Sequence, residues 1–228
     1  MTFETFASAD EATSAAADAL LAALVPPGPK HLIVTGGRTP GPVYDRLAAS
    51  DLDWSRVSFT LSDERFVDTS SKDSNEGLIR ARLLTGHAAA ATFVPLKGHG
   101  PTPDADARAA NAAVEALIPF DAALVGMGDD GHVASIFPTT PGFAALLSPD
   151  TPRAVVGIDV AGLQPFVPRI SLTGRAILGS KLIVVLVSGD GKRALLDRVQ
   201  SDTAFAPPIS HLIRQQATPV RILWWPGA

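Results

Sequence analysis

Short apolar runs alternate with longer amphipathic segments along most of the chain. The apolar runs are at most eight residues long and are bounded by glycine, proline or charged residues, which is typical of buried strands. Five of them predict strands at Leu32–Val34, Val57–Leu61, Ala122–Val125, Lys181–Ser188 and Val220–Trp225.

Five other segments have the spacing of amphipathic helices: Ser8–Leu24, Pro42–Ala49, Ser74–Leu84, Asp104–Ile118 and Lys192–Val199. Ser8 and Ser74 are placed to accept hydrogen bonds at helix N-termini. Strands separated by helix-length segments predict right-handed βαβ units. We therefore expect an α/β fold with a mainly parallel sheet and helices on both of its faces.

Composition and charge narrow the class of protein. The 228 residues are 46% hydrophobic and 18% charged, with no repeat or low-complexity linker, so we expect a single domain over residues 1–228. The strongly apolar run Leu182–Val187 is far shorter than the ~20 residues of a membrane span. A net charge of −4 without a basic run argues against nucleic-acid binding. The absence of cysteine and of a signal-like N-terminus favours the cytoplasm.

Four predicted strand ends carry polar or glycine-rich sequence: Thr35–Thr39, Ser62–Arg65, Gly126–His132 and Ser188–Lys192. In open parallel sheets, ligands bind beyond the carboxyl ends of the strands. We therefore expect these four segments to meet at one edge of the sheet and to form a ligand site.

The first two segments suggest an anion site. Gly36 and Gly37 precede a predicted helix and offer unhindered N–H groups to an anion, although a plain strand-to-helix turn would use glycines equally well. The segment has neither a P-loop ending nor a dinucleotide fingerprint. Arg65 is a candidate phosphate clamp, and Asp63 is a candidate for orienting a base or a substrate hydroxyl. The alternative is a solvated loop with local ion pairs.

Gly126–His132 is the most informative segment. His132 is the best candidate for a general base, because imidazole titrates near neutral pH. The N–H groups of Gly128 and Gly131 are candidates for stabilising an oxyanion. A structural histidine in a glycine turn is the alternative reading.

Two further cations are ambiguous, and several chemistries find no motif. Lys192, in the first turn of a predicted helix, and Arg169 suit either a phosphate or ordinary surface ion pairs. No Gly-x-Ser-x-Gly elbow supports a serine nucleophile, and no histidine pair or cluster suggests zinc. We therefore expect direct attack by water, without a metal or cofactor.

Together these segments resemble the 6-phosphogluconolactonases. The resemblance follows the family's order along the chain and is most specific in the fourth of five segments: Thr35–Pro40, Ser62–Val67, Asp73–Asn75, Gly126–Pro138 and Pro168–Thr173. It implies a Rossmann-like fold shared with glucosamine-6-phosphate deaminases. It also implies hydrolysis of 6-phosphoglucono-δ-lactone to 6-phosphogluconate in the oxidative pentose phosphate pathway.

The resemblance also implies roles for individual residues. His132 matches the base, and the phosphate would be held by Arg65, Arg169, Lys192 and the Gly36–Gly37 loop. Arg38 stands where many relatives have a small hydroxyl residue, so it offers either an extra phosphate contact or a solvent-facing side chain. The expected partner is a phosphorylated sugar lactone, and the protein is expected to be a monomer or a small homo-oligomer.

Two alternatives remain open at this stage. Deaminases of the same fold carry an acidic residue just before the proline of the histidine segment, and here that residue is Phe137, which favours the lactonase. A non-catalytic sugar-phosphate sensor would need a DNA-binding segment, and nothing resembles one.

Overall fold

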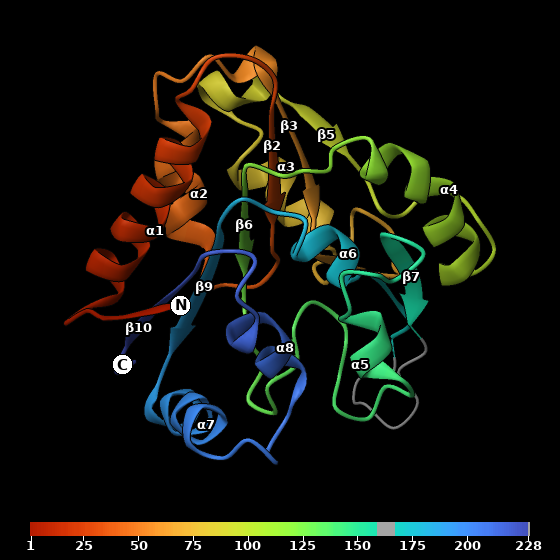
Figure 1. Cartoon of the computed structure of the whole chain (residues 1–228). Helices are drawn as coiled ribbons and strands as arrows, with labels where there is room; N and C mark the ends of the chain where they lie inside the picture. Colours follow the sequence, from red (N-terminus) through yellow and green to blue (C-terminus); the bar gives the residue numbers. More distant parts are fainter. Residues whose placement is uncertain (159–166, 228) are drawn as a thin grey trace.

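The computed structural model describes residues 1–158 and 167–227, and its central feature is a parallel sheet (Figure 1). Its seven strands lie in the order β1 (Thr2–Thr5), β10 (Val220–Trp225), β9 (Ile183–Ser188), β6 (Ala122–Val125), β2 (Lys30–Val34), β3 (Val57–Leu61) and β5 (Thr92–Val94). All neighbouring pairs are parallel, which confirms the predicted α/β class. The edge strands β1 and β5 are short and were not predicted.

Helices cover both faces of this sheet. The helices of the described residues are α1 (Ala9–Leu24), α2 (Gly41–Ala48), α3 (Asn75–Arg82), α4 (Pro103–Glu115), α5 (Phe143–Leu146), α6 (Gly174–Ile177), α7 (Asp190–Ser201) and α8 (Pro208–Arg214), with short 3₁₀ turns at Trp54–Arg56 and Gly86–Ala90. Figure 1 shows α1 and α2 on one side of the central strands and α6 and α8 on the other. Successive residues Ile183–Val187 are all buried, as expected for a strand that is covered on both faces.

Local signals account for where the helices begin. The hydroxyl of Ser8 accepts the N–H of Glu11, and that of Ser74 accepts the N–H of Gly77, so both predicted caps are confirmed. Thr102 caps α4 in the same way.

A second, antiparallel sheet was not predicted. It joins β4 (Asp63–Arg65), β8 (Arg169–Leu172) and β7 (Val155–Ile158), in that order. Asp63–Arg65 reads as a polar loop in the sequence, but its backbone pairs with β8 and places Arg65 opposite Arg169. One continuous hydrophobic cluster extends from the central sheet to Ile170 and Leu172 of this second sheet.

The order in which strands are added to the central sheet reverses between β2 and β6. From β2 it proceeds to β3 and β5 on one side, whereas β6, β9 and β10 follow on the other. The loops after β2 and β6 therefore diverge and leave a crevice at the carboxyl edge, where ligands bind in doubly wound folds. Among the described residues, no helix is both long and apolar enough to cross a membrane.

The opposite edge of the sheet is tied by an ion cluster in which Asp121 and Lys30 are buried and Lys181 is exposed. The Asp121 carboxylate accepts hydrogen bonds from the ammonium groups of Lys30 (3.2 Å) and Lys181 (2.9 Å) and from the N–H of His31 (2.9 Å). Burial acts to raise the pKa of Asp121, but these three hydrogen bonds outweigh it and hold the pKa below its ordinary value. The starts of β2, β6 and β9 are thereby joined.

Replacing Asp121 with asparagine should lower the free energy of unfolding at pH 7 by about 3–5 kcal/mol, because buried Lys30 loses its counter-ion. A lowered folded pKa stabilises the fold above the unfolded value near 3.8, and this stabilisation is lost as the pH falls. The native protein should therefore lose stability below about pH 4 more steeply than the variant. Denaturant titrations at several pH values would measure both effects, and parallel acid limbs would contradict the assignment.

Candidate active site

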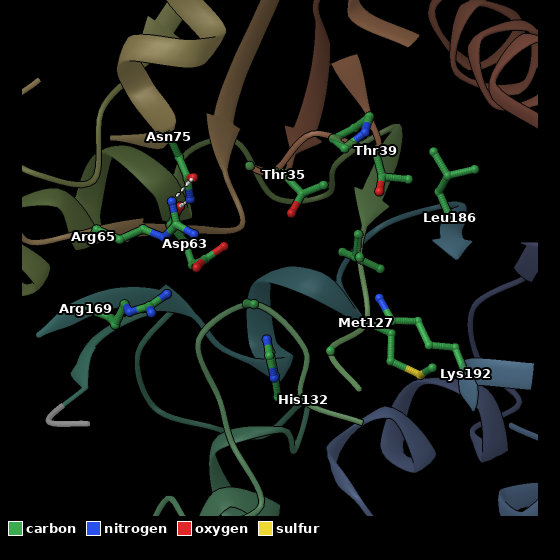
Figure 2. Close-up of a pocket in the computed structure, with 17 residues that line it drawn as sticks. Thr35, Thr39, Asp63, Arg65, Asn75, Met127, His132, Arg169, Leu186 and Lys192 are labelled. Carbon is green, nitrogen blue, oxygen red and sulfur yellow. Dashed lines mark hydrogen bonds between the residues drawn. The ribbon is translucent and has the colours of Figure 1, made fainter. Parts of the chain in front are cut away.

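A pocket opens at the crevice between β2 and β6, and all four predicted segments contribute to it (Figure 2). Its lining comprises Thr35, Gly36, Gly37, Thr39, Pro40, Asp63, Arg65, Asn75, Val125, Gly126, Met127, Gly128, His132, Ala134, Arg169, Leu186 and Lys192. The predicted residues that lie outside this lining are Arg38, which is exposed, and Gly131.

His132 is held by its own loop. Its Nδ1 atom lies 2.6 Å from Oδ1 of Asp130, and the same oxygen accepts the His132 backbone N–H at 3.0 Å. Because a carboxylate can only accept, Nδ1 is the donor, and in the neutral imidazole Nε2 therefore carries the lone pair that a general base needs. The Phe137 ring packs against the imidazole at a centroid distance of 4.4 Å. The arrangement can orient the imidazole and stabilise the imidazolium that forms when it takes a proton.

The two glycines expected to stabilise an oxyanion do something else. The Gly128 N–H donates to the carbonyl of His132, and the Gly131 N–H donates to the carbonyl of Gly128, both at 3.0 Å. Neither N–H group is therefore directed at a substrate, and this sequence-based assignment is corrected. Gly128 instead makes room, because a Cβ atom there would lie 2.1 Å from the His132 ring.

The Thr35–Thr39 loop presents free backbone N–H groups. Within the described parts of the chain, the N–H groups of Gly36 and Gly37 donate to no acceptor. The loop is fixed by buried Tyr44, whose hydroxyl accepts the Thr35 N–H at 2.9 Å and donates to the Thr35 carbonyl. Burial raises the pKa of Tyr44, which the Thr35 hydrogen bond only partly offsets, so the phenol stays neutral.

Asp63 and Arg65 face the pocket, whereas Glu64 between them faces the protein. Arg65 Nη1 donates to the carbonyl of Asp73 (2.8 Å) and to Oδ1 of Asn75 (3.0 Å). The Glu64 carboxylate accepts the N–H groups of Arg65, Asn75 and Glu76, and so caps α3. Burial raises the pKa of Glu64 despite these hydrogen bonds.

Asn75 joins three parts of the site. Its Nδ2 donates to the carbonyl of Asp63 at 2.8 Å, while its Oδ1 accepts from Arg65. Its side chain also packs so closely on Gly36 that a Cβ atom at position 36 would lie 1.9 Å from Oδ1. Glycine is therefore required at position 36 for this close approach.

Asp63 does not orient His132. Its carboxylate accepts hydrogen bonds from the hydroxyls of Ser62 (2.9 Å) and Ser135 (2.6 Å), and the contact to the imidazole belongs to Asp130. Of the two roles expected for Asp63, that of binding a substrate hydroxyl therefore stays a prediction.

The cations occupy two sides of the pocket. Figure 2 shows Arg65 and Arg169 on one side near Asp63, and Lys192 on the other beside Met127. Burial and the neighbouring Arg65 lower the pKa of Arg169, against the opposing effect of Asp63. Lys192 lies in the first turns of α7, with its ammonium group 3.7 Å from the exposed carboxylate of Asp129.

Comparison with known proteins shows the family of this chain. The sequence model described as glucosamine-6-phosphate isomerases/6-phosphogluconolactonase matches residues 4–224. The chain belongs to this family. It is 43% identical over 225 residues to a 6-phosphogluconolactonase of Caulobacter vibrioides, covering 97% of this chain and 96% of that protein. It is 36% identical over 209 residues to one of Rhizobium meliloti, covering 91% and 89%.

Solved structures of the glucosamine-6-phosphate isomerase/6-phosphogluconolactonase family share the fold. The crystal structure of a 6-phosphogluconolactonase from Shewanella baltica superposes with a TM-score of 0.89 at 32% identity. The superposition covers 99% of this chain and 97% of that one. The fold described above is therefore one that a solved member of this family adopts.

Sequence reasoning missed several residues of the site. Asp130 and Asn75 stood inside segments that the sequence singled out, but nothing in the spacing distinguished them from Asp63 or Asp129. Ser135 likewise lay in the histidine segment. Tyr44 gave no signal, because a tyrosine on the apolar face of a helix reads as core.

Proposed function

We propose that this protein hydrolyses 6-phosphoglucono-δ-lactone to 6-phosphogluconate. The observation that carries the proposal is the pairing of His132 Nδ1 with Asp130, which leaves Nε2 as a base in a pocket with three cations. The close relationship to proteins named 6-phosphogluconolactonase supports this substrate. Since phosphorylated sugars are kept inside cells, the proposal implies the cytoplasm.

The proposed reaction is general-base hydrolysis. His132 takes a proton from water as the water oxygen attacks the lactone carbonyl carbon. The donors that line the pocket then stabilise the negative charge that develops on the carbonyl oxygen, and they also bind the phosphate. These are the guanidinium groups of Arg65 and Arg169, the Lys192 ammonium group, and the N–H groups of Gly36 and Gly37. Collapse of the tetrahedral intermediate breaks the ring C–O bond, and the leaving ring oxygen takes the proton held by His132 and becomes a hydroxyl. The carboxylic acid formed at C1 then releases its proton to solvent, which gives the carboxylate and leaves His132 neutral.

The electrostatics favour an anionic ligand. Arg65 and Arg169 are paired across two antiparallel strands, and like charges directly opposite one another repel. The carboxylates of Asp63, Glu64 and Asp73 act against this repulsion at Arg169, but none of them forms an ion pair with either guanidinium group among the described residues. A phosphate or an oxyanion between the guanidinium groups would relieve the repulsion and bind through charge-assisted hydrogen bonds.

The deaminase alternative is disfavoured by Phe137. Deaminases of this fold place a carboxylate at that position, whereas here the phenyl ring packs on the His132 imidazole. The proposal is tested by following lactone hydrolysis after subtracting the spontaneous reaction, alongside an assay for ammonia release from glucosamine 6-phosphate. Ammonia release without accelerated lactone hydrolysis would replace the proposal with the deaminase.

Replacing Arg65 with alanine should raise KM for the lactone about 10- to 100-fold with a smaller effect on kcat, because a charge-assisted contact to substrate is lost. The matched control is Arg108→Ala, which removes the same charge from an exposed position on α4. Steady-state kinetics on both variants separate a local contact from a general change in net charge. Equal effects in the two variants would contradict the role of Arg65.

A further inference from the structure

The Asp63 carboxylate lines the pocket and is held from behind by two serine hydroxyls. Asp63 is 7% exposed, and each of its carboxylate oxygens accepts a hydrogen bond from a serine that is completely buried. Ser62 donates to Oδ1 at 2.9 Å and Ser135 donates to Oδ2 at 2.6 Å. Because a carboxylate oxygen has about two acceptor sites, each oxygen keeps one site for a donor in the pocket.

Ser135 brings Asp63 and His132 into a defined relation. It follows His132 by three positions, so the Ser135–Asp63 hydrogen bond ties the second sheet to the loop that carries the base. The turn between them is held in place: Val133 and Ile136 exchange backbone hydrogen bonds, and Ala134 adopts the left-handed region at φ 51°. The Ser135 N–H is fixed as well, since it donates to the Ser171 hydroxyl at 3.1 Å.

Ser62 fixes the other side of the carboxylate. Its hydroxyl also lies 3.0 Å from that of Thr35, the residue that begins the glycine loop after β2. The carboxylate is thus suspended between the loops that follow β2 and β6. A hydrogen-bond acceptor held this rigidly near the base suits recognition of the ring next to the reacting carbon.

We propose that Ser135 is a positioning residue that, together with Ser62, holds Asp63 to accept a hydrogen bond from the lactone C2 hydroxyl. This hydroxyl is bonded to the carbon next to the carbonyl carbon that the activated water attacks, and its single O–H can donate to one of the two remaining acceptor sites. The inference rests on the proposed lactonase function. In this proposal, the hydrogen-bonded pair of Asp63 and Ser135 positions the sugar ring relative to His132.

The test compares two substrates: 6-phosphoglucono-δ-lactone and its 2-deoxy analogue. In the native protein, kcat/KM should be about 10- to 100-fold lower for the 2-deoxy lactone, as expected for a lost hydrogen bond to a charged group. In Ser135→Ala, kcat/KM should fall for 6-phosphoglucono-δ-lactone but change little for the 2-deoxy lactone. The ratio of the two kcat/KM values should therefore shrink to a few-fold. Asp63→Asn should shrink it similarly.

Two further variants keep the outcome interpretable. Ser62→Ala removes the other hydrogen bond and should also shrink the ratio, even if Ser135→Ala folds poorly. Ser180→Ala removes a buried hydroxyl that has no hydrogen-bond partner among the described residues, and it should leave the ratio unchanged.

Two results would overturn the inference. A native protein that hydrolyses both lactones equally well would show that Asp63 does not read the C2 hydroxyl. Variants at Ser135 and Ser62 that slow both substrates by the same factor would show a purely structural role. Absence of hydrolysis by the native protein would instead refute the lactonase function itself, so the two failures are distinguishable.

Discussion

Replacing His132 with alanine should lower kcat for lactone hydrolysis about 10²- to 10⁴-fold and change KM little. The imidazole lines the pocket, and its Nδ1 is held by Asp130 at 2.6 Å, which leaves Nε2 without a hydrogen-bond partner among the described residues. Binding should persist, because the cations and glycine N–H groups are untouched. Initial rates must be corrected for the spontaneous hydrolysis of the lactone, which would otherwise dominate the measurement on the variant.

Two companion variants sharpen this experiment. His87→Ala removes an exposed histidine outside the pocket and should retain native turnover. Asp130→Asn keeps the shape of the pair, but an amide can donate to Nδ1 and thereby place the imidazole proton on Nε2, so kcat should again fall strongly. Native turnover in His132→Ala would eliminate the histidine as the base.

Replacing Gly128 with alanine should lower kcat about 10²-fold, although the substitution removes no catalytic group. The added Cβ atom would lie 2.1 Å from Nδ1 and Cε1 of His132, so the ring must leave its position beside Asp130. A displacement of this size removes the base from its line to the substrate. Circular dichroism and thermal melting would verify that the variant remains folded.

Gly126→Ala is the matched control for this variant. It adds the same methyl group two positions earlier in the loop, where a Cβ atom would meet nothing within 4 Å. Its loss of kcat should be at least ten-fold smaller. Similar losses in both variants would mean that the loop backbone, rather than the space around the imidazole, determines activity.

The parts of the fold that have a strong local signal in the sequence could be predicted. The strands Val57–Leu61 and Val220–Trp225 match their predicted bounds, because both are short segments rich in β-branched and aromatic residues. Asp63–Arg65 and Arg169–Leu172 could not be recognised as strands. They are three and four residues long, and they pair with each other across about a hundred residues of chain.

The site was predictable as a set of segments but less so atom by atom. Topology brings the ends of β2, β3, β6 and β9 to one edge, which is why Gly36, Asp63, His132 and Lys192 line one pocket. Which carboxylate pairs with His132 depends on the path of a single turn, and sequence spacing does not encode that path. The same applies to the N–H groups of Gly128 and Gly131, which the turn consumes within itself.

The alternation along Asp63–Glu64–Arg65 has a consequence for which sequence changes the site can tolerate. Side chains of a strand alternate between faces, so two of these residues serve the pocket and the one between them anchors the start of α3. A substitution at one position alters a single role. An insertion or deletion of one residue before the strand would exchange all three roles at once, placing a buried anchor in the pocket and charged ligand groups in the core. We therefore regard this segment as one in which chain length, more than the identity of any single residue, sets the limit on variation.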